Sequence, residues 1–93
     1  MDWKHLTRLS DGARMVVERV RLADTGIAIE GSFELPPLAQ LDLDDQVFVA
    51  AFVTSHGSIK EMERLFGVSY PTIKGRLNRL AAALDPALSV DSD

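Results

Sequence analysis

The clearest pattern of apolar and polar residues lies between residues 58 and 84, where two helical periodicities follow one another. The apolar positions are Ile59, Met62, Leu65 and Phe66 in the first stretch and Ile73, Leu77, Leu80, Ala81 and Leu84 in the second. Gly67 lies between them and suits the left-handed backbone that ends many helices. Ser58 and Ser69 stand at the two expected N-cap positions. The pattern predicts two helices joined by a glycine turn, the second over about residues 70–84.

A third helix is predicted before this pair. Asp42 suits its N-cap, and Asp45, three residues on, is a weaker analogue of the glutamate in a capping box. Val47, Phe48, Ala51 and Phe52 form its apolar stripe, and Gly57 is the expected stop. Together the three segments predict a helix-turn-helix with a supporting first helix.

The first forty residues show a different pattern. Residues 2–10 have the apolar spacing of a short amphipathic helix, whose Trp3 is expected to pack on the body or on a partner. Residues 15–22 and 27–35 then alternate as strands around the turn residues 23–26. On the second strand, Ile27, Ile29, Phe33 and Leu35 are expected on one face, and Gly31 is expected to mark a bulge or a close backbone approach.

A two-stranded hairpin is marginally stable alone in water, so its apolar face needs a cover. The helices of the same chain or the hairpin of a second subunit could supply it, and a homodimer formed through the hairpin is the leading hypothesis. The fold class predicted is therefore α+β: an N-terminal arm and β-hairpin over residues 1–40, a three-helix helix-turn-helix domain over 41–85, and an acidic flexible tail over 86–93.

Charge separates along the chain in a way that bears on function. Residues 58–80 hold five basic and two acidic side chains, although the whole chain has a net charge of −4. The stretch from Ser69 to Leu80 contains no acid. DNA phosphates attract such a segment, and Arg, Lys and Asn side chains suit base edges. Double-stranded DNA is therefore the predicted partner, bound through a helix that enters the major groove.

Eight polar residues are candidates for DNA contacts. They are Lys60, Ser69, Tyr70, Thr72, Lys74, Arg76, Asn78 and Arg79. Ser69 and Thr72 are expected at phosphates near the start of the second helix, and Lys60 at a phosphate from the preceding helix. The other five are expected to divide between base edges and backbone.

Several other classes of function find little support. The chain has no cysteine, which excludes disulfides and thiolate zinc sites, and its two histidines, His5 and His56, lie near no expected nucleophile. We therefore expect no catalytic residues, no metal and no cofactor. No segment has the apolar length of a membrane span or of a signal peptide, so we expect a cytoplasmic protein without a membrane partner.

Two runs of sequence also resemble a bacterial and archaeal family of unassigned function. They are E-G-S-F-E-L-P-P-L-A-Q-L over 30–41 and F-V-A-A-F-V-T-S-H-G-S-I-K-E-M-E-R-L-F-G-V-S-Y-P-T-I-K-G-R-L over 48–77. The family shares an S-Y-P-T-V-R type helix, for which the resemblance implies a helix-turn-helix similar to those of sigma factors and small regulators. Here Lys74 stands where an arginine is expected and Asn78 where an aspartate is expected. Many relatives carry a zinc ribbon before this region, and the hairpin is expected to take its place here without metal.

The main alternative is a protein-interaction module of a regulatory system. In that case the same helices dock on another protein and the hairpin mediates assembly. The acidic balance of the whole chain favours this alternative. Salt dependence separates the two, because counterions compete with DNA phosphates but hardly affect an apolar docking site.

Overall fold

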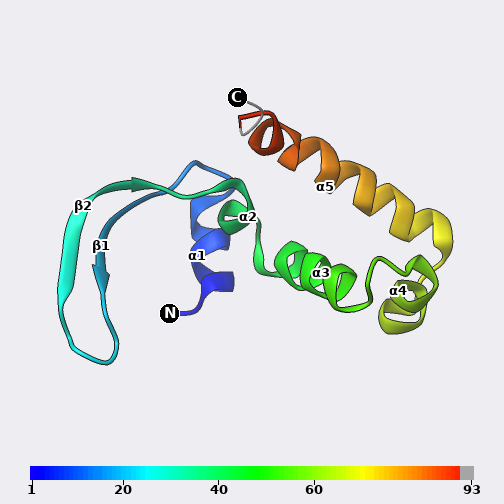
Figure 1. Ribbon diagram of the computed structural model, residues 1–93, viewed down its shortest axis with the longest axis horizontal. Helices are drawn as coiled ribbons and strands as arrows, with labels where there is room; N and C mark the ends of the chain where they lie inside the picture. The colour runs from blue at the N-terminus through cyan, green and yellow to red at the C-terminus, as the bar shows by residue number, and fades with distance from the viewer. Residues whose placement is uncertain (91–93) are drawn as a thin grey trace.

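The structure, a computed structural model, describes the backbone of residues 1–90 and the side chains of residues 1–85. Its elements in chain order are α1 (Trp3–Ser10), β1 (Val16–Arg21), β2 (Ala28–Glu34), α2 (Pro37–Gln40), α3 (Leu43–Thr54), α4 (Ile59–Phe66) and α5 (Tyr70–Val90). The chain is thus an α+β protein, in which an N-terminal helix and an antiparallel hairpin precede the remaining helices (Figure 1). This confirms the predicted fold class.

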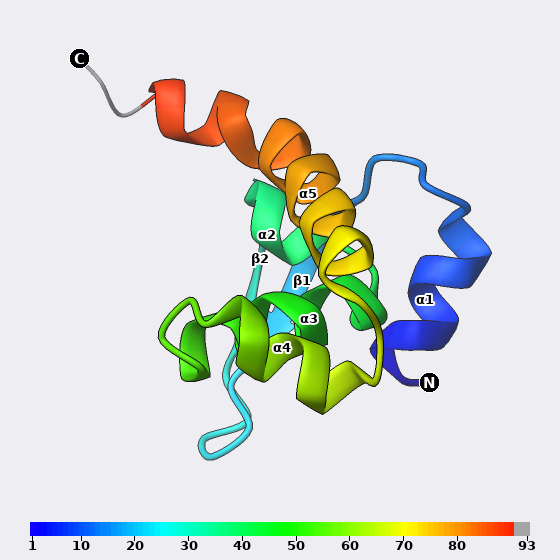
Figure 2. The ribbon, with the colours of Figure 1, turned by 90° about the vertical axis from the view of Figure 1, so that its right-hand side faces the viewer.

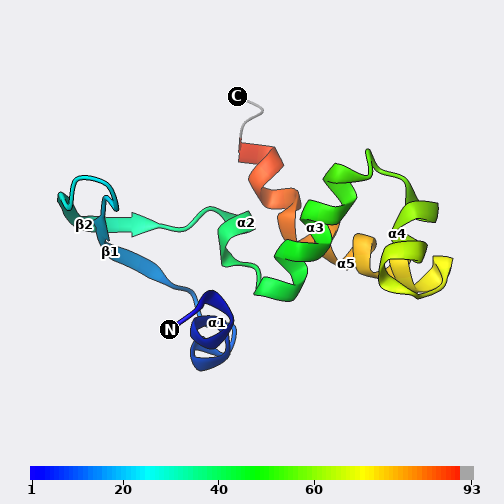
Figure 3. The same cartoon turned by 90° about the horizontal axis from the view of Figure 1, so that it is seen from below.

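The hairpin and the helix-turn-helix lie at opposite ends of the molecule. Figures 1 and 3 both place β1 and β2 at one end and the junction of α4 with α5 at the other, with α1 and α2 nearer the middle. The molecule measures 45 × 35 × 26 Å along its principal axes. The hairpin is therefore not covered by the helices of its own chain.

The core lies among α3, α4 and α5. Its fully buried side chains are Phe48, Met62, Ile73 and Leu80, and partly buried apolar residues such as Phe66 and Leu77 surround them. The rings of Phe48 and Phe66 are 5.3 Å apart between centroids, a distance typical of tilted aromatic pairs. This cluster confirms the centre of each stripe predicted for the three helices, whereas three predicted members, Val47, Leu65 and Ala81, are exposed.

Local signals at the helix ends account for most of the boundaries. The Asp42 carboxylate accepts from the Asp45 backbone N–H at 2.8 Å, and the Ser58 hydroxyl accepts from the Glu61 N–H at 3.1 Å. Gly67 ends α4 in the left-handed region, with φ of +64°. The reciprocal half of the capping box is replaced, because the Glu61 carboxylate pairs with Arg64 within α4.

The end of α3 differs from the prediction. The helix ends at Thr54, three residues before the expected stop at Gly57. His56 and Gly57 both adopt a left-handed backbone, with φ of +57° and +77°, and the Gly57 N–H donates to the Phe52 carbonyl at 2.9 Å. A two-residue left-handed turn therefore lies between the helix end and the Ser58 cap.

The hairpin contains the bulge expected near Gly31, and this bulge overturns the predicted faces of the second strand. Val17 pairs with Phe33 and Val20 pairs with Ile29, so β2 carries one more residue than β1 between the two pairs. Because Val17 and Val20 are three residues apart on a regular strand, they point to opposite faces. Phe33 and Ile29 therefore also lie on opposite faces, although the alternation in sequence predicted one.

The N-terminal arm packs on the body, one of its two expected positions. The indole Nε1 of Trp3 donates to the Leu41 carbonyl at 3.3 Å, and the Gln46 side chain donates to the same carbonyl at 3.0 Å. A one-turn helix not predicted from the sequence, α2, lies just before this contact. It begins at Pro37, whose fixed φ suits the first helical position.

The last helix is longer than predicted. α5 continues to Val90, past the expected end near residue 84 and into the segment expected to be a flexible tail. The three alanines at 81–83 favour a helix, although Pro86 within it removes one backbone donor and crowds the carbonyl four residues earlier. The rest of the predicted tail, residues 91–93, lies outside the described residues. Within the described chain, no helix combines the length and the apolar character needed to span a membrane.

Candidate nucleic-acid interface

The turn between α4 and α5 sets the angle of the helix-turn-helix. The backbone N–H groups of Gly67 and Val68 both donate to the Glu63 carbonyl, at 2.8 Å and 3.3 Å, and so satisfy the end of α4. Helix α5 then starts at Tyr70 and packs against α4, with α3 beside them (Figure 2). This is the arrangement in which the second helix of the pair is presented at the surface.

The outward face of α5 carries small, uncharged side chains. Ile73 and Leu80 are buried, whereas Gly75 and Asn78 are exposed. With 3.6 residues per turn, Gly75 and Asn78 lie on the side of the helix opposite to Ile73 and Leu80. A Cβ placed at Gly75 would meet no neighbouring atom within 4 Å, so this face is open to an approaching surface.

Two hydroxyl groups meet at the start of α5. The Ser69 Oγ and the Thr72 Oγ1 lie 3.2 Å apart, and the Ser69 carbonyl accepts from the Ile73 N–H at 3.1 Å. Tyr70 is half-exposed beside them. Free N–H groups and the helix dipole favour an anion at such a helix start. Ser69 and Thr72, both predicted phosphate contacts, are therefore brought together.

Asp45 joins two of the predicted DNA-binding arginines to α3. Its Oδ1 accepts from the Arg76 Nη2 at 3.1 Å and from the Arg79 Nη2 at 2.9 Å, and its Oδ2 accepts from the Arg79 Nη1 at 3.4 Å. Asp45 is 8% exposed. The sequence suggested Asp45 as part of a helix cap, but its carboxylate instead lies between two guanidinium groups.

Arg76 has a second contact, with the core. Its guanidinium carbon lies 4.5 Å from the centroid of the Phe48 ring, within the range of a cation–π interaction. Arg76 thus lies on the inner side of α5, between Asp45 and Phe48. The side chain of Arg79 is 58% exposed and that of Arg76 is 32% exposed, so Arg79 is the more accessible of the two.

The ion pairs shift the ionisation of their members. The hydrogen bond from Arg79 lowers the pKa of Asp45 below its usual value of 3.8, and Arg76 acts in the same direction, whereas burial opposes both. The same bond raises the pKa of Arg79. Asp45 is therefore ionised at neutral pH and partly neutralises the positive charge of α5.

The remaining predicted residues are spread over both helices of the motif. Lys60 and Asn78 are exposed on α4 and α5, and Lys74 is half-buried on α5. Within the part of the chain that the structure describes, neither lysine forms an ion pair within 4 Å, whereas Arg64 pairs with Glu61. The free positive charge of the motif is thus carried mainly by Lys60 and Lys74.

Sequence reasoning missed the roles of Asp45 and Phe48. A signal for them does exist, because Asp45 and Phe48 are three residues apart on α3, as Arg76 and Arg79 are on α5. Residues three apart share one face of a helix. An acid and an aromatic ring on one helix face, and two arginines at the same spacing on another, were therefore visible in the sequence, but their contact depends on how α3 and α5 cross.

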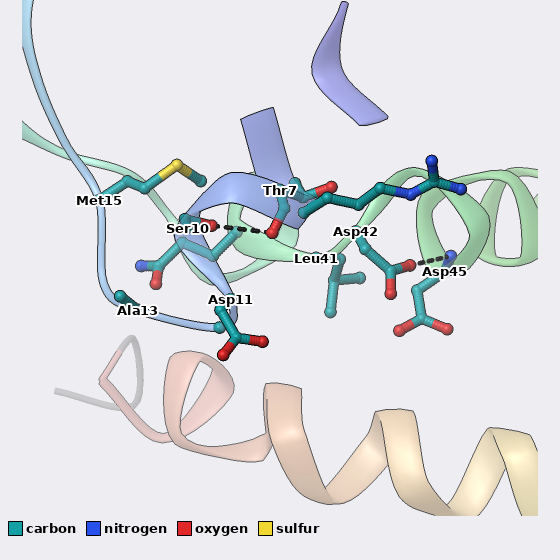
Figure 4. Close-up of a pocket in the computed structure, with 11 residues that line it drawn as sticks. Thr7, Ser10, Asp11, Ala13, Met15, Leu41, Asp42 and Asp45 are labelled. Atoms are coloured by element: carbon teal, nitrogen blue, oxygen red, sulfur yellow. Dashed lines mark hydrogen bonds between the residues drawn. The ribbon is translucent and has the colours of Figure 1, made fainter. Parts of the chain in front are cut away.

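A cavity of about 470 Å³ lies beside Asp45, between α1 with the loop that follows it and the start of α3 (Figure 4). Its wall includes Asp11, Asp42 and Asp45, with Arg8 from α1. Asp42 is engaged as the cap of α3, and Asp45 is held by the arginines. In residues 1–90, no group of three or more histidine, aspartate or glutamate residues is placed to hold a metal ion.

The helical region also has a counterpart among known families. Residues 41–86, just under half of the chain, match the model of a family described as "Domain of unknown function (DUF2089)-HTH". No curated protein and no solved structure matches the chain. The matched segment contains α3 and α4 and most of α5, the three helices of the motif described above. It is therefore similar to an uncharacterised family that contains a helix-turn-helix.

Proposed function

We propose that this protein is a DNA-binding transcription regulator that uses α5 as its recognition helix. The observation that carries the proposal is the exposed face of α5 around Gly75 and Asn78. No carboxylate occurs between Ser69 and Leu84, and the N-terminal turn of the helix is exposed. A surface of this kind suits the major groove, where the N-terminal residues of a recognition helix meet base edges.

The exposed residues divide into two proposed roles. Ser69 and Thr72 contact phosphates at the start of α5, and Lys60 contacts a phosphate from α4. Tyr70, Lys74 and Asn78 lie nearest to base edges, where an asparagine can pair with adenine.

The two arginines have different proposed roles. The guanidinium of Arg79 has donors beyond those given to Asp45 and can reach a phosphate. Arg76, held between Asp45 and Phe48, acts mainly by holding α5 on α3.

The test is the binding of a labelled random duplex, measured by fluorescence anisotropy at low and moderate salt. We expect micromolar affinity that falls steeply with salt, and a salt slope reduced by about one unit in Lys60→Ala, because this lysine is proposed to neutralise one phosphate. Arg8→Ala is the matched control, because it also removes one positive charge from an exposed helix, but from α1. A folded protein that binds no duplex at low salt would exclude the proposal.

Docking on another protein is the second candidate function. It is favoured by the ion pairs that neutralise Arg64, Arg76 and Arg79 and by the net charge of −4. Binding to a partner protein that is insensitive to salt, with no binding to DNA, would select this alternative.

Other features of the sequence extend the same proposal. We propose that the protein acts in the cytoplasm, without catalysis or a cofactor, and as a homodimer. A likeness to the helix-turn-helix of sigma factors, and the replacement of a zinc ribbon by the hairpin, also stay predictions.

A further inference from the structure

The outer half of the hairpin has one apolar face that is left uncovered by the part of the chain that the structure describes. Val20 pairs directly with Ile29, and the Leu22 N–H donates to the Ile27 carbonyl at 2.7 Å, so these four side chains lie on one face. We call them the apolar hairpin face. Their exposed fractions are 42% for Val20, 42% for Leu22, 58% for Ile27 and 46% for Ile29.

The opposite face of the same half is polar. Arg21 pairs with Ala28, and Arg19 pairs with Glu30, whose Oε1 lies 3.7 Å from the Arg19 Nε. The outer half of the hairpin is therefore amphipathic, with charge on one side and aliphatic groups on the other. A sheet with this pattern normally packs its apolar side on a core.

The chain exposes more accessible surface than a compact monomer of the same mass. A monomeric globular protein of 10.2 kDa is expected to expose about 5,300 Å², but this chain exposes 7060 Å². Its radius of gyration is 16.0 Å, compared with about 12 Å expected for a compact domain of this length. The excess, roughly 1,700 Å², is a total over the whole chain, and the exposed hairpin contributes part of it. For comparison, each partner buries roughly 800 Å² in a standard interface. The hairpin and the end of α5 both project from the body and contribute to the excess (Figure 2).

We propose that the apolar hairpin face packs against the same face of a second copy of this chain. Two such faces related by a twofold axis form a small β-sandwich of two hairpins. In it, each hairpin covers the apolar face of the other. The charged groups of Arg19, Arg21 and Glu30 stay on the outer sides, so the interface buries none of them. The pairing also supplies the cover that a lone hairpin needs to be stable in water.

The dimer has a consequence for the helix-turn-helix. Because the hairpin and the junction of α4 with α5 lie at opposite ends of the chain, each copy in the dimer holds this junction away from the shared hairpins (Figures 1 and 3). This inference rests on the homodimer of the proposed function and assigns its interface. The interface is tested without DNA, so it can fail while DNA binding stands, and the reverse.

The mass of the full chain in solution is the first test. We expect size-exclusion light scattering at micromolar concentration to give about twice the 10.2 kDa of one chain. Val20→Thr/Ile29→Thr keeps β-branched residues on the strands but removes apolar groups, and should raise the dimer dissociation constant on the order of 100-fold. Arg21→Thr/Ala28→Thr changes the directly paired residues of the opposite face and should leave the mass unchanged.

A spin-label experiment tests the dimer even if Val20→Thr/Ile29→Thr unfolds, because it leaves Val20 and Ile29 unchanged. The chain has no cysteine, so Asp24→Cys, in the exposed turn between the strands and outside the apolar hairpin face, gives a single site for a spin label. Dipolar coupling between labels can then arise only between two chains, and should disappear on dilution with unlabelled protein. A mass of one chain for the unchanged protein, absent coupling, or a dimer unaffected by Val20→Thr/Ile29→Thr would each overturn the proposal.

Discussion

Arg76 and Asp45 stand 31 positions apart in the chain, yet the Arg76 Nη2 donates to the Asp45 Oδ1 at 3.1 Å where α5 meets the first turn of α3. The same carboxylate accepts from Arg79. The ion pairs that hold α5 on α3 thus also neutralise part of the positive charge of α5, the proposed DNA-binding helix. Stability and DNA affinity are therefore expected to respond in opposite directions to changes at Asp45.

Asp45→Asn keeps the shape of the side chain but removes its charge. We expect the free energy of unfolding to fall by about 1–3 kcal/mol, because two guanidinium groups lose a charged acceptor. We also expect tighter binding to random duplex at low salt, since Arg79 becomes available to phosphates and one nearby negative charge is removed. Urea unfolding followed by circular dichroism and anisotropy titrations measure the two effects. Asp44→Asn is the control, because Asp44 lies in the same helical turn but is exposed.

The contribution of Asp45 should depend on pH in a defined direction. Its pKa in the folded protein is lowered by Arg79 and Arg76, from an ordinary value of 3.8. Its stabilising effect is therefore complete well above pH 3.8 and is lost as the pH falls through 3.8 toward the lower folded value. The difference in unfolding free energy between the unchanged protein and Asp45→Asn measures this, since other carboxyl groups cancel. A difference that stays constant from pH 6 down to about pH 3 would contradict it.

Arg76→Ala and Arg79→Ala should differ, although the two residues share one partner. Arg76→Ala removes a hydrogen bond and the contact with the Phe48 ring, so we expect a loss of about 1–3 kcal/mol in unfolding free energy. Arg79→Ala leaves Asp45 paired with Arg76 and should cost less than about 1 kcal/mol. Duplex affinity, measured well below the unfolding temperature, should fall more in Arg79→Ala than in Arg76→Ala, because Arg79 is the more exposed of the two side chains. The reverse order in both measurements would indicate that Arg76 is the outward residue.

The elements that sequence reasoning predicted well are those set by local chemistry. Asp42, Ser58 and Gly67 act within four residues of their own helix ends, so their effect can be predicted without knowledge of the fold. The buried core residues were also predictable, because a 3.6-residue period fixes which side chains share a face of a helix. The motif of three helices was predictable on that basis.

Features that depend on distant partners were not predictable in the same way. The roles of Arg76 and Asp45 depend on how α5 crosses α3, which no local pattern fixes. In the hairpin, Gly31 signalled a bulge, but a bulge of one residue also reverses the faces beyond it. Phe33 was therefore assigned to the wrong side although the irregularity itself was anticipated.

Gly75→Ala separates the stability of α5 from its proposed contact with DNA. A methyl group at Gly75 meets nothing within 4 Å, and alanine favours a helix by about 1 kcal/mol, so the free protein should become more stable. If α5 enters the major groove with this face inward, the same methyl group should weaken duplex binding severalfold. Thermal unfolding and anisotropy on one preparation measure both.

Gly67→Ala is the matched control for Gly75→Ala. Gly67 also has open space around it, but its φ of +64° strains any other residue, so alanine there should lower the unfolding free energy by about 1 kcal/mol. The two variants therefore separate the effect of backbone conformation from the effect of steric crowding, because only Gly67 has a positive φ and neither site is crowded. If Gly75→Ala stabilises the protein and leaves duplex affinity unchanged, the face of α5 that carries Gly75 and Asn78 does not contact DNA. Binding would then have to involve the edge of the helix nearer to Lys74 and Tyr70.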